Sequence, residues 1–230
     1  MAKINYEEAI KKPFTDIAKL IIGIVLSIVP IIHWLAKGFV LECSGLGKTK
    51  PSKKMPEFKN WGSLFIKGLA SDIILLIYTI PSILVFLVGA GSTMGTLGTL
   101  TGSILATAST QEELSQLFSQ NWYLALPLLV KLAPIMIVGF ILLLIALYLT
   151  PIAVLGYVKT KKFSEAFNLN KVTKKAFTVD YFVVWIIALI LTGIITAILL
   201  IIPWFGQSIA FFIAGVISYS LYGQIYRKFR

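Results

Sequence analysis

Long apolar runs separated by short polar segments dominate the pattern of this chain. The first run covers residues 17–41, has Pro30 in its middle, and carries His33 and Lys37 towards its end. A helix of about 20 apolar residues crosses the hydrocarbon core of a bilayer, so this run is long enough to span. The pattern favours a transmembrane helix kinked at Pro30. A re-entrant hairpin that turns near Pro30 is the alternative.

Later apolar runs predict the remaining membrane helices. The second span covers residues 73–88, and the third begins near Leu132 because Lys131 precedes it. Residues 181–226 contain no charged residue and are long enough for two spans, with a turn at residues 203–206. We therefore predict an all-α, polytopic transmembrane helical bundle of about five spans with kinked helices. It would have six membrane segments if a further loop dips into the bilayer.

The polar segments between these runs indicate the topology. Residues 1–16 have apolar positions at helical spacing, interrupted by Pro13, and predict a short interfacial amphipathic helix. Loops 42–60 and 151–180 are rich in lysine, whereas residues 89–121 contain no Lys or Arg. Lysine-rich loops stay on the cytoplasmic side, so both of these loops and the C-terminus are predicted there, with 89–121 as an outer loop. The side of the N-terminus stays open, because it depends on whether the first run spans or re-enters.

Composition supports a membrane location. Hydrophobic residues make up 57% of the 230 residues, charged residues only 13%, and the mean hydropathy is +0.87. A soluble fold cannot bury that much apolar surface, so we expect a single integral membrane domain over residues 1–230. The net charge of +11 lies in short loops rather than on a separate basic face, which argues against nucleic-acid binding. The chain has one cysteine and one histidine, which excludes an internal disulfide and the usual His/Cys metal sites, and no cofactor is predicted.

Ionisable residues within or beside the apolar runs are the candidate ligand or lipid contacts, because a charge is costly inside a bilayer. His33 and Lys37 lie one helical turn apart, and Asp72 opens the second span. Lys131 lies between two prolines near the predicted outer surface, where it either snorkels to the headgroups or contacts a phosphate or carboxylate. Lysines of the first basic loop could contact lipid phosphate; they are Lys48, Lys53 and Lys54.

Aromatic residues flank both basic loops. Such side chains collect where a membrane helix meets the headgroups. The residues expected to anchor the chain at the interface are Phe58, Trp61, Phe65, Phe163 and Phe167.

Three groups of short motifs, in a fixed order and spacing, resemble a known family. They are Gly38-Phe39, Met55-Pro56-Glu57-Phe58, Asn60-Trp61, Leu64-Phe65, Gly68, Tyr78 and Pro81; Tyr148, Pro151 and Lys162-Phe163-Ser164-Glu165-Ala166-Phe167; and Pro203, Gly206, Tyr222-Gly223 and Tyr226. With these motifs the chain resembles the archaeal multi-pass membrane protein family catalogued as Domain of Unknown Function 4013. It departs by having Phe39 where a tyrosine is typical and by the Cys43-Ser44-Gly45-Leu46-Gly47 insert. The resemblance implies the fold and a membrane location, and no activity comes with it.

The sequence contains no recognisable catalytic constellation. We therefore expect no enzyme activity, and a non-enzymatic accessory or scaffold component of the cell membrane that binds lipid or a protein partner. A weak repeat between the two basic hairpins supports the alternative, a small transporter or lipid-moving protein. The third hypothesis is a membrane enzyme that acts on lipid, in which Asp72, Glu57 and His33 would meet near the inner face. Expected partners are membrane lipids and a protein partner or a second copy of the chain, and no nucleic acid.

Overall fold

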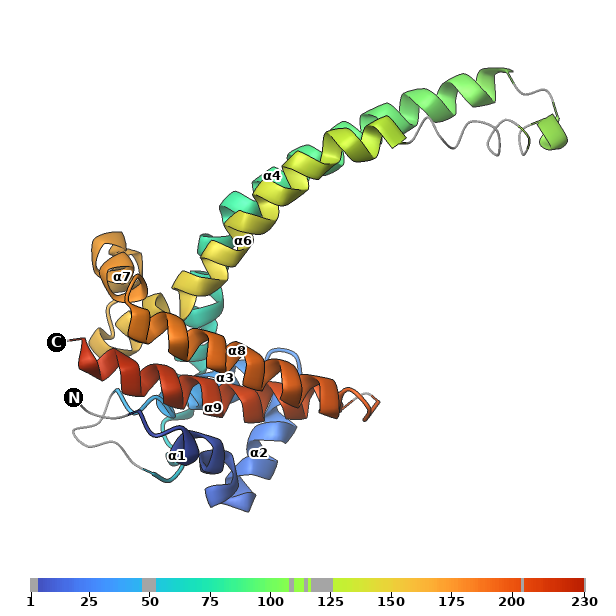
Figure 1. Ribbon diagram of the computed structural model, residues 1–230. Helices are drawn as coiled ribbons and strands as arrows, with labels where there is room; N and C mark the ends of the chain where they lie inside the picture. The colour runs from blue at the N-terminus through green and yellow to red at the C-terminus, as the bar shows by residue number, and fades with distance from the viewer. Residues whose placement is uncertain are drawn as a thin grey trace. The chain divides into compact units, whose positions relative to one another are not determined.

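The computed structural model describes residues 4–46, 53–107, 110–113, 116, 126–203 and 205–229. Every regular element in this part of the chain is helical. The chain forms two compact units (Figure 1). Unit 1 comprises Met1–Leu76 and Tyr148–Arg230, and unit 2 comprises Ile77–Leu147. The two long helices α4 (Trp61–Thr107) and α6 (Leu126–Thr160) contribute to both units.

The first apolar run forms two short helices rather than one kinked helix. They are α2 (Ile17–Ile28) and α3 (His33–Glu42). Val29 is extended, with φ −87° and ψ 123°, as expected for a residue that precedes proline, and this ends α2. At 12 residues, α2 is about 18 Å long, well short of the roughly 30 Å apolar core of a bilayer.

The N-terminal end of α2 and the C-terminal end of α3 lie close together. Lys12 Nζ, just before α2, donates to the carbonyl of Cys43, just after α3, at 2.7 Å. The Met55 amide donates to Thr15 Oγ1 at 3.4 Å, and Lys19 Nζ lies 3.3 Å from Glu57. The run therefore leaves and returns at the same end of unit 1. This is the geometry of the re-entrant alternative, and the expectation of a kinked helix through Pro30 is wrong.

Among the described residues, four helices are long and apolar enough to cross a membrane. The candidate spans are Trp61–Gly95 of α4, Leu132–Thr160 of α6, α8 (Val179–Leu199) and α9 (Gly206–Lys228). The protein is thus an all-α polytopic bundle. In this described part of the chain, the candidate spans are one fewer than the five predicted, because the first run is a hairpin.

Helix α9 forms the centre of unit 1. It lies side by side with α8 and also packs against α1 (Tyr6–Lys11), α2 and α3 (Figure 1). Phe212 and Val216 of α9 are fully buried against Phe39 and Val40 of α3. Gly23 of α2 leaves room for the Phe212 ring, because a Cβ at this position would overlap it. Large apolar side chains of α8 stay exposed instead, as expected of a face that meets lipid.

Two glycines bring α3 and the start of α4 into close contact. A Cβ on Gly38 of α3 would overlap the Leu64 carbonyl, and a Cβ on Gly68 of α4 would overlap the Trp34 carbonyl. Small residues at such positions let helix backbones approach closely. The contact is therefore reciprocal, one glycine from each helix.

Unit 2 contains two helical segments, the second part of α4 from residue 77 to Thr107 and the first part of α6 from Leu126 to residue 147. The ring of Phe86 of α4 packs against Gly139 of α6, where a Cβ would overlap the ring. Gly89 of α4 lies against Ile135 of α6. Residues 89–107, predicted to begin an outer loop, instead continue α4. Ser92 and Thr93 donate their hydroxyls to the Gly89 carbonyl, so these polar side chains are satisfied within the helix. The loop expectation is wrong for residues 89–107; of residues 108–121, only 110–113 and 116 are described.

The segments at the basic end of unit 1 are largely helical as well. The second basic segment was predicted to begin at residue 151, but α6 continues to Thr160. A 3₁₀ helix, η3 (Phe163–Phe167), and the short helix α7 (Leu169–Ala176) then lead into α8. At the N-terminus, α1 is followed by the 3₁₀ helix η1 (Lys12–Thr15), which contains Pro13.

Candidate functional site

The α3–α4 contact brings together three of the predicted site residues, His33, Lys37 and Asp72. Lys37 Nζ forms an ion pair with Asp72 Oδ1, and His33 Nε2 lies 3.6 Å from Asp72 Oδ2. Trp34 Nε1 donates to the same Oδ2 at 2.8 Å. We call these four residues the Asp72 cluster. Helical spacing on α3 found His33 and Lys37, but Trp34, between them in sequence, was missed because an indole N–H gives no charge signal.

The Asp72 carboxylate thus accepts from two donors on α3, Trp34 and Lys37, and lies near a third side chain of that helix, His33. The side chain of Lys37 is only 16% exposed and that of Asp72 32%, so the pair is partly shielded from solvent. A second ion pair, Lys67 to Glu42 at 2.8 Å, lies further along the same contact. Charges at membrane depth are stabilised by such partners. The arrangement joins α3 to α4 beside their glycine contact.

His33 also contacts the turn that precedes α3. Its Nδ1 lies 3.3 Å from the Pro30 carbonyl, and its Nε2 lies on the side of Asp72. The side chain therefore links the turn at Pro30 to the Asp72 cluster.

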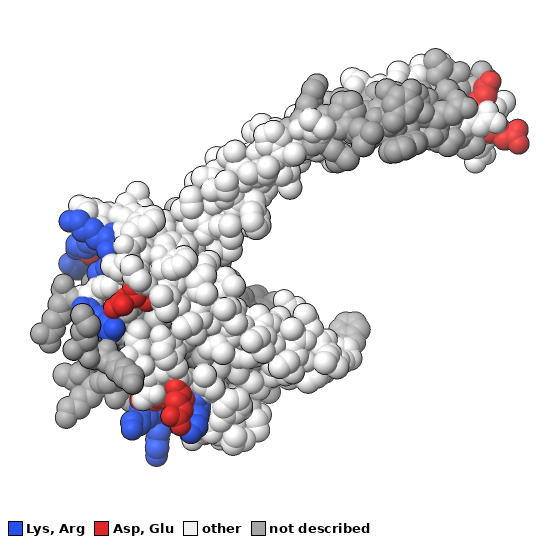
Figure 2. Space-filling model, in the orientation of Figure 1, with Lys and Arg blue, Asp and Glu red and all other residues white. Residues whose placement is uncertain are grey.

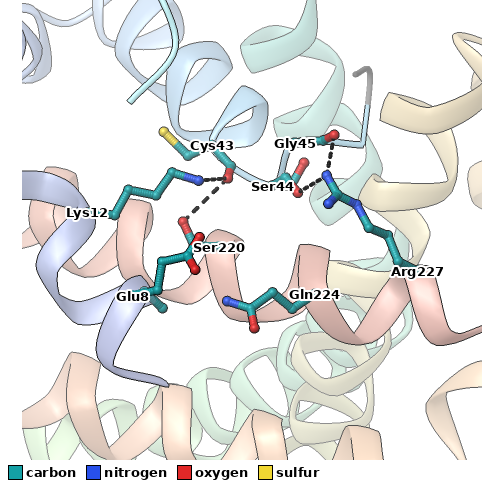
Figure 3. A pocket seen from close by; sticks show the side chains of 9 residues that line it. Glu8, Lys12, Cys43, Ser44, Gly45, Ser220, Gln224 and Arg227 are labelled. Carbon is teal, nitrogen blue, oxygen red and sulfur yellow. Dashed lines mark hydrogen bonds between the residues drawn. The ribbon is translucent and has the colours of Figure 1, made fainter. Parts of the chain in front are cut away.

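A second polar site joins the end of α3 to η1 and α9 (Figure 3). Lys12 Nζ and Ser220 Oγ both donate to the Cys43 carbonyl, at 2.7 and 3.4 Å. Arg227 Nη2 donates to the carbonyls of Gly45, at 2.5 Å, and Ser44, at 3.5 Å. We call this the α3 terminus site. Two cations on the carbonyl end of a helix complement its dipole, so both side chains act as a C-terminal cap.

The cavity within the α3 terminus site is small, with a volume of about 20 Å³. That is room for about one water molecule. Gly45 has a positive φ of 67°, which suits the sharp exit of the chain from α3. This site was not predicted from the sequence. The available signal was the spacing of Ser220, Gln224 and Arg227, which places polar side chains on one face of an otherwise apolar helix.

The same end of α9 holds the N-terminal segment. The Asn5 amide donates to Gln224 Oε1 at 2.7 Å, and Gln224 Nε2 donates to the Asn5 carbonyl at 3.2 Å. The first described helix, α1, and the C-terminal part of α9 therefore lie close together within unit 1 (Figure 1).

A third site is basic and lies on the outside of unit 1, over η3 and α7 (Figure 2). We call it the basic shelf; its lysines are Lys159, Lys161, Lys162, Lys171, Lys174 and Lys175. Lys171 Nζ lies 3.1 Å from both carboxylate oxygens of Glu165. Lys175 Nζ lies over the Tyr226 ring, 3.9 Å from its centroid. Burial lowers the pKa of Lys175, and the neighbouring charge of Lys171 lowers it further.

The structure places the other predicted site residues apart from these clusters. Lys53 and Lys54 are exposed. Lys48 and the side chain of Lys131 lie outside the described residues, although the backbone of Lys131 belongs to α6.

The predicted anchors divide into packed and exposed residues. Phe58 stacks on Phe39, with ring centroids 3.9 Å apart, and Phe65 meets Trp34 edge-on at 5.4 Å. Trp61 and Phe163 are exposed, and Phe167 lies 5.1 Å from Phe163. Phe58 and Phe65 therefore contribute mainly to packing within unit 1.

Comparisons with known proteins identify a family and no described relative. No curated protein and no solved structure matches the chain. One family model matches residues 21–204, most of the chain, from α2 to the turn after α8. The chain therefore belongs to the family described as "Protein of unknown function (DUF4013)".

Proposed function

We propose that this protein is a non-enzymatic component of the cell membrane that binds lipid or a protein partner as an accessory or scaffold. The observation that carries the proposal is the Asp72 cluster. Its ionisable side chains, the first candidates for chemistry, bind one another across two helices. A carboxylate that already receives an ammonium and an indole N–H is suited to joining helices. Binding functions are then left to the outer surfaces.

The charge distribution favours lipid as a partner and a cytoplasmic position for the basic end. The basic shelf, the exposed Lys53 and Lys54, and the C-terminal end of α9 all belong to unit 1. Lysines near membrane helices stay on the cytoplasmic side and are attracted to anionic headgroups.

Native mass spectrometry of the protein, extracted gently from its own membrane, tests this proposal. We expect a stoichiometric lipid or protein partner to be retained. A protein that retains neither, and that turns over lipid after reconstitution, would contradict a binding role.

The α2–α3 hairpin favours a second candidate, a small transporter or lipid-moving protein. Transporters use helices broken at membrane depth to form their sites, and here the break at Pro30 lies beside the Asp72 cluster. Flux and lipid-scrambling assays in proteoliposomes separate the two candidates. Movement of a solute or lipid that Asp72→Asn abolishes in a folded protein would favour the transporter.

A further inference from the structure

The lysines of the basic shelf differ in whether they contact a charged or aromatic side chain of the protein. Lys171 is paired with Glu165, and Lys175 and Lys159 lie over the ring of Tyr226. By contrast, Lys161, Lys162 and Lys174 are exposed and form no ion pair with any residue that the structure describes. Three cations are thus available for a partner outside the chain.

The backbone holds these three cations outward. Lys161 follows α6 with a positive φ of 58°, a conformation that residues with a Cβ seldom adopt. Its amide still donates to the Tyr157 carbonyl, at 2.7 Å, and the chain turns sharply there into η3. On α7, Val172 and Ala176 are one turn apart and buried. Lys174, between them in sequence, therefore lies on the opposite, exposed face.

Apolar side chains surround the free lysines and are exposed as well. Phe163 is 39% exposed, Leu169 59% and Phe177 74%. Figure 2 shows the charged side chains gathered over this end of unit 1, with uncharged surface beside them. Cations alternating with large apolar groups match the headgroup region, where phosphates lie next to the first methylene groups of the acyl chains. A nucleic-acid backbone would leave these apolar groups in water.

From these observations we infer that the basic shelf is a binding site for anionic membrane lipid. Lys161, Lys162 and Lys174 contact the headgroup phosphates, and Phe163, Leu169 and Phe177 enter the adjoining acyl region. The inference rests on the proposed binding function and adds the class of lipid and its site. Contacts with phosphate of this kind weaken as salt rises, because exposed charges are screened.

Competition between two lipids tests the inference on the full chain. The protein is purified in detergent with equal amounts of phosphatidylglycerol and phosphatidylcholine, and native mass spectrometry counts the lipids bound to it. The test variant is Lys161→Gln/Lys162→Gln/Lys174→Gln. The control is Lys11→Gln/Lys59→Gln, which removes exposed lysines that already face Glu7 and Glu57 and that belong to no candidate lipid site. A third variant, with arginine at the three shelf positions, keeps the charge.

We expect the wild type to prefer phosphatidylglycerol, and the shelf variant to lose that preference by about tenfold or more, since each lysine contributes up to about fivefold. The control and the arginine variant should keep most of it. Equal losses in shelf variant and control would overturn the inference, because diffuse charge would then explain the preference. Loss of a protein partner with unchanged phosphatidylglycerol binding would also overturn it.

Failure of the inference is distinguishable from failure of the proposed function. A wild type that retains lipid without preference for phosphatidylglycerol contradicts only the inference. A wild type that retains neither lipid nor partner contradicts both. Equal thermal unfolding of all four proteins confirms that the substitutions act on binding.

Discussion

At the level of single residues, Asp72 decides how α3 and α4 are joined. Its carboxylate is the shared acceptor for Lys37 and Trp34, and His33 Nε2 lies 3.6 Å away. Removing one member of a shielded ion pair leaves the other charge without compensation, which costs more than the pair itself contributes. Because Asp72 is partly exposed, water offsets some of that cost.

We therefore expect Asp72→Asn to lower the free energy of unfolding by about 1–3 kcal/mol. The measurement is thermal or denaturant unfolding in detergent. Glu7→Gln is the control, because its ion pair with Lys11 is formed by side chains 74% and 71% exposed. Such a surface pair should contribute little. Equal effects of the two substitutions would show that the Asp72 cluster does not hold the helices together.

The lowered pKa of Lys175 predicts how the free energy of unfolding depends on pH. Its pKa is lowered, chiefly by burial, so the folded state binds this proton less tightly than the unfolded state does. The Tyr226 ring beneath the ammonium favours the charged form and offsets part of this cost. A lowered lysine pKa destabilises the folded state at neutral pH, and the penalty is relieved as pH rises from the folded pKa towards the ordinary value of 10.5.

Unfolding of the wild type and of Lys175→Met, measured over this alkaline pH range, tests the predicted direction of the change in stability. The wild type should gain stability relative to the variant as pH rises. A constant difference between the two, or a relative loss by the wild type, would mean that the ring compensates burial fully.

At the level of elements, the α3–α4 contact depends on backbone proximity. Gly38→Ala or Gly68→Ala would place a Cβ on a carbonyl of the facing helix and push the helices apart. We expect each to lower the free energy of unfolding by about 1–3 kcal/mol. Gly62→Ala is the matched control on α4, since nothing lies within 4 Å of a Cβ there. It should be neutral or stabilise by up to about 1 kcal/mol, as alanine favours helix. Unfolding in detergent measures all three, and a Gly62→Ala effect as large as the others would contradict the packing explanation.

The elements also show what could be read from sequence. Hydrophobicity predicted the long helices, because length and apolar content alone allow a span. It could not separate a kink at Pro30 from a hairpin, since both have the same apolar pattern. The distinction comes from the contact of Lys12 with the Cys43 carbonyl, 31 residues apart. Residues 89–107 were predicted as loop from their Gly, Ser and Thr content, yet they continue α4. At the start of this stretch, Ser92 and Thr93 donate their hydroxyls to the Gly89 carbonyl, and Gly89 packs against Ile135 of α6.

The candidate sites, like the helices, could be predicted only in part from the sequence. The spacing of His33 and Lys37 placed them one helical turn apart, and the lipid-enzyme hypothesis placed Asp72 and His33 near the inner face. The ion pair between Lys37 and Asp72, 35 residues apart in sequence, is seen only in the fold. The α3 terminus site was missed because its cations, Lys12 and Arg227, lie near opposite ends of the chain.

At the level of the whole molecule, the hairpin bears on which side the N-terminus lies. Since α2–α3 returns to its starting end and four candidate spans follow it among the described residues, we predict that both termini and both basic segments lie on one side of the membrane. The bond between Asn5 and Gln224 agrees with this.

Cysteine labelling tests this arrangement. In a chain whose buried Cys43 is replaced by alanine, single cysteines at Glu7, Lys53 and Thr110 report three positions with an impermeant maleimide. Cysteines at Glu7 and Lys53 should react from the cytoplasmic side, and the cysteine at Thr110 from the other. Reaction of the Glu7 and Thr110 positions from the same side would mean that the first run crosses the membrane after all.

The central position of α9 has a consequence for the order in which the protein is made. The hairpin α2–α3 buries Gly23 and Val40 against α9, yet α9 follows it by more than 160 residues of synthesis. At about 5–20 residues per second, the hairpin waits roughly 8–35 s on the ribosome before its partner exists. During that interval its apolar inner face has no native cover. A membrane chaperone or insertase that shields helices temporarily would find its substrate there, and synonymous codons that slow translation between α3 and α9 would lengthen the exposure.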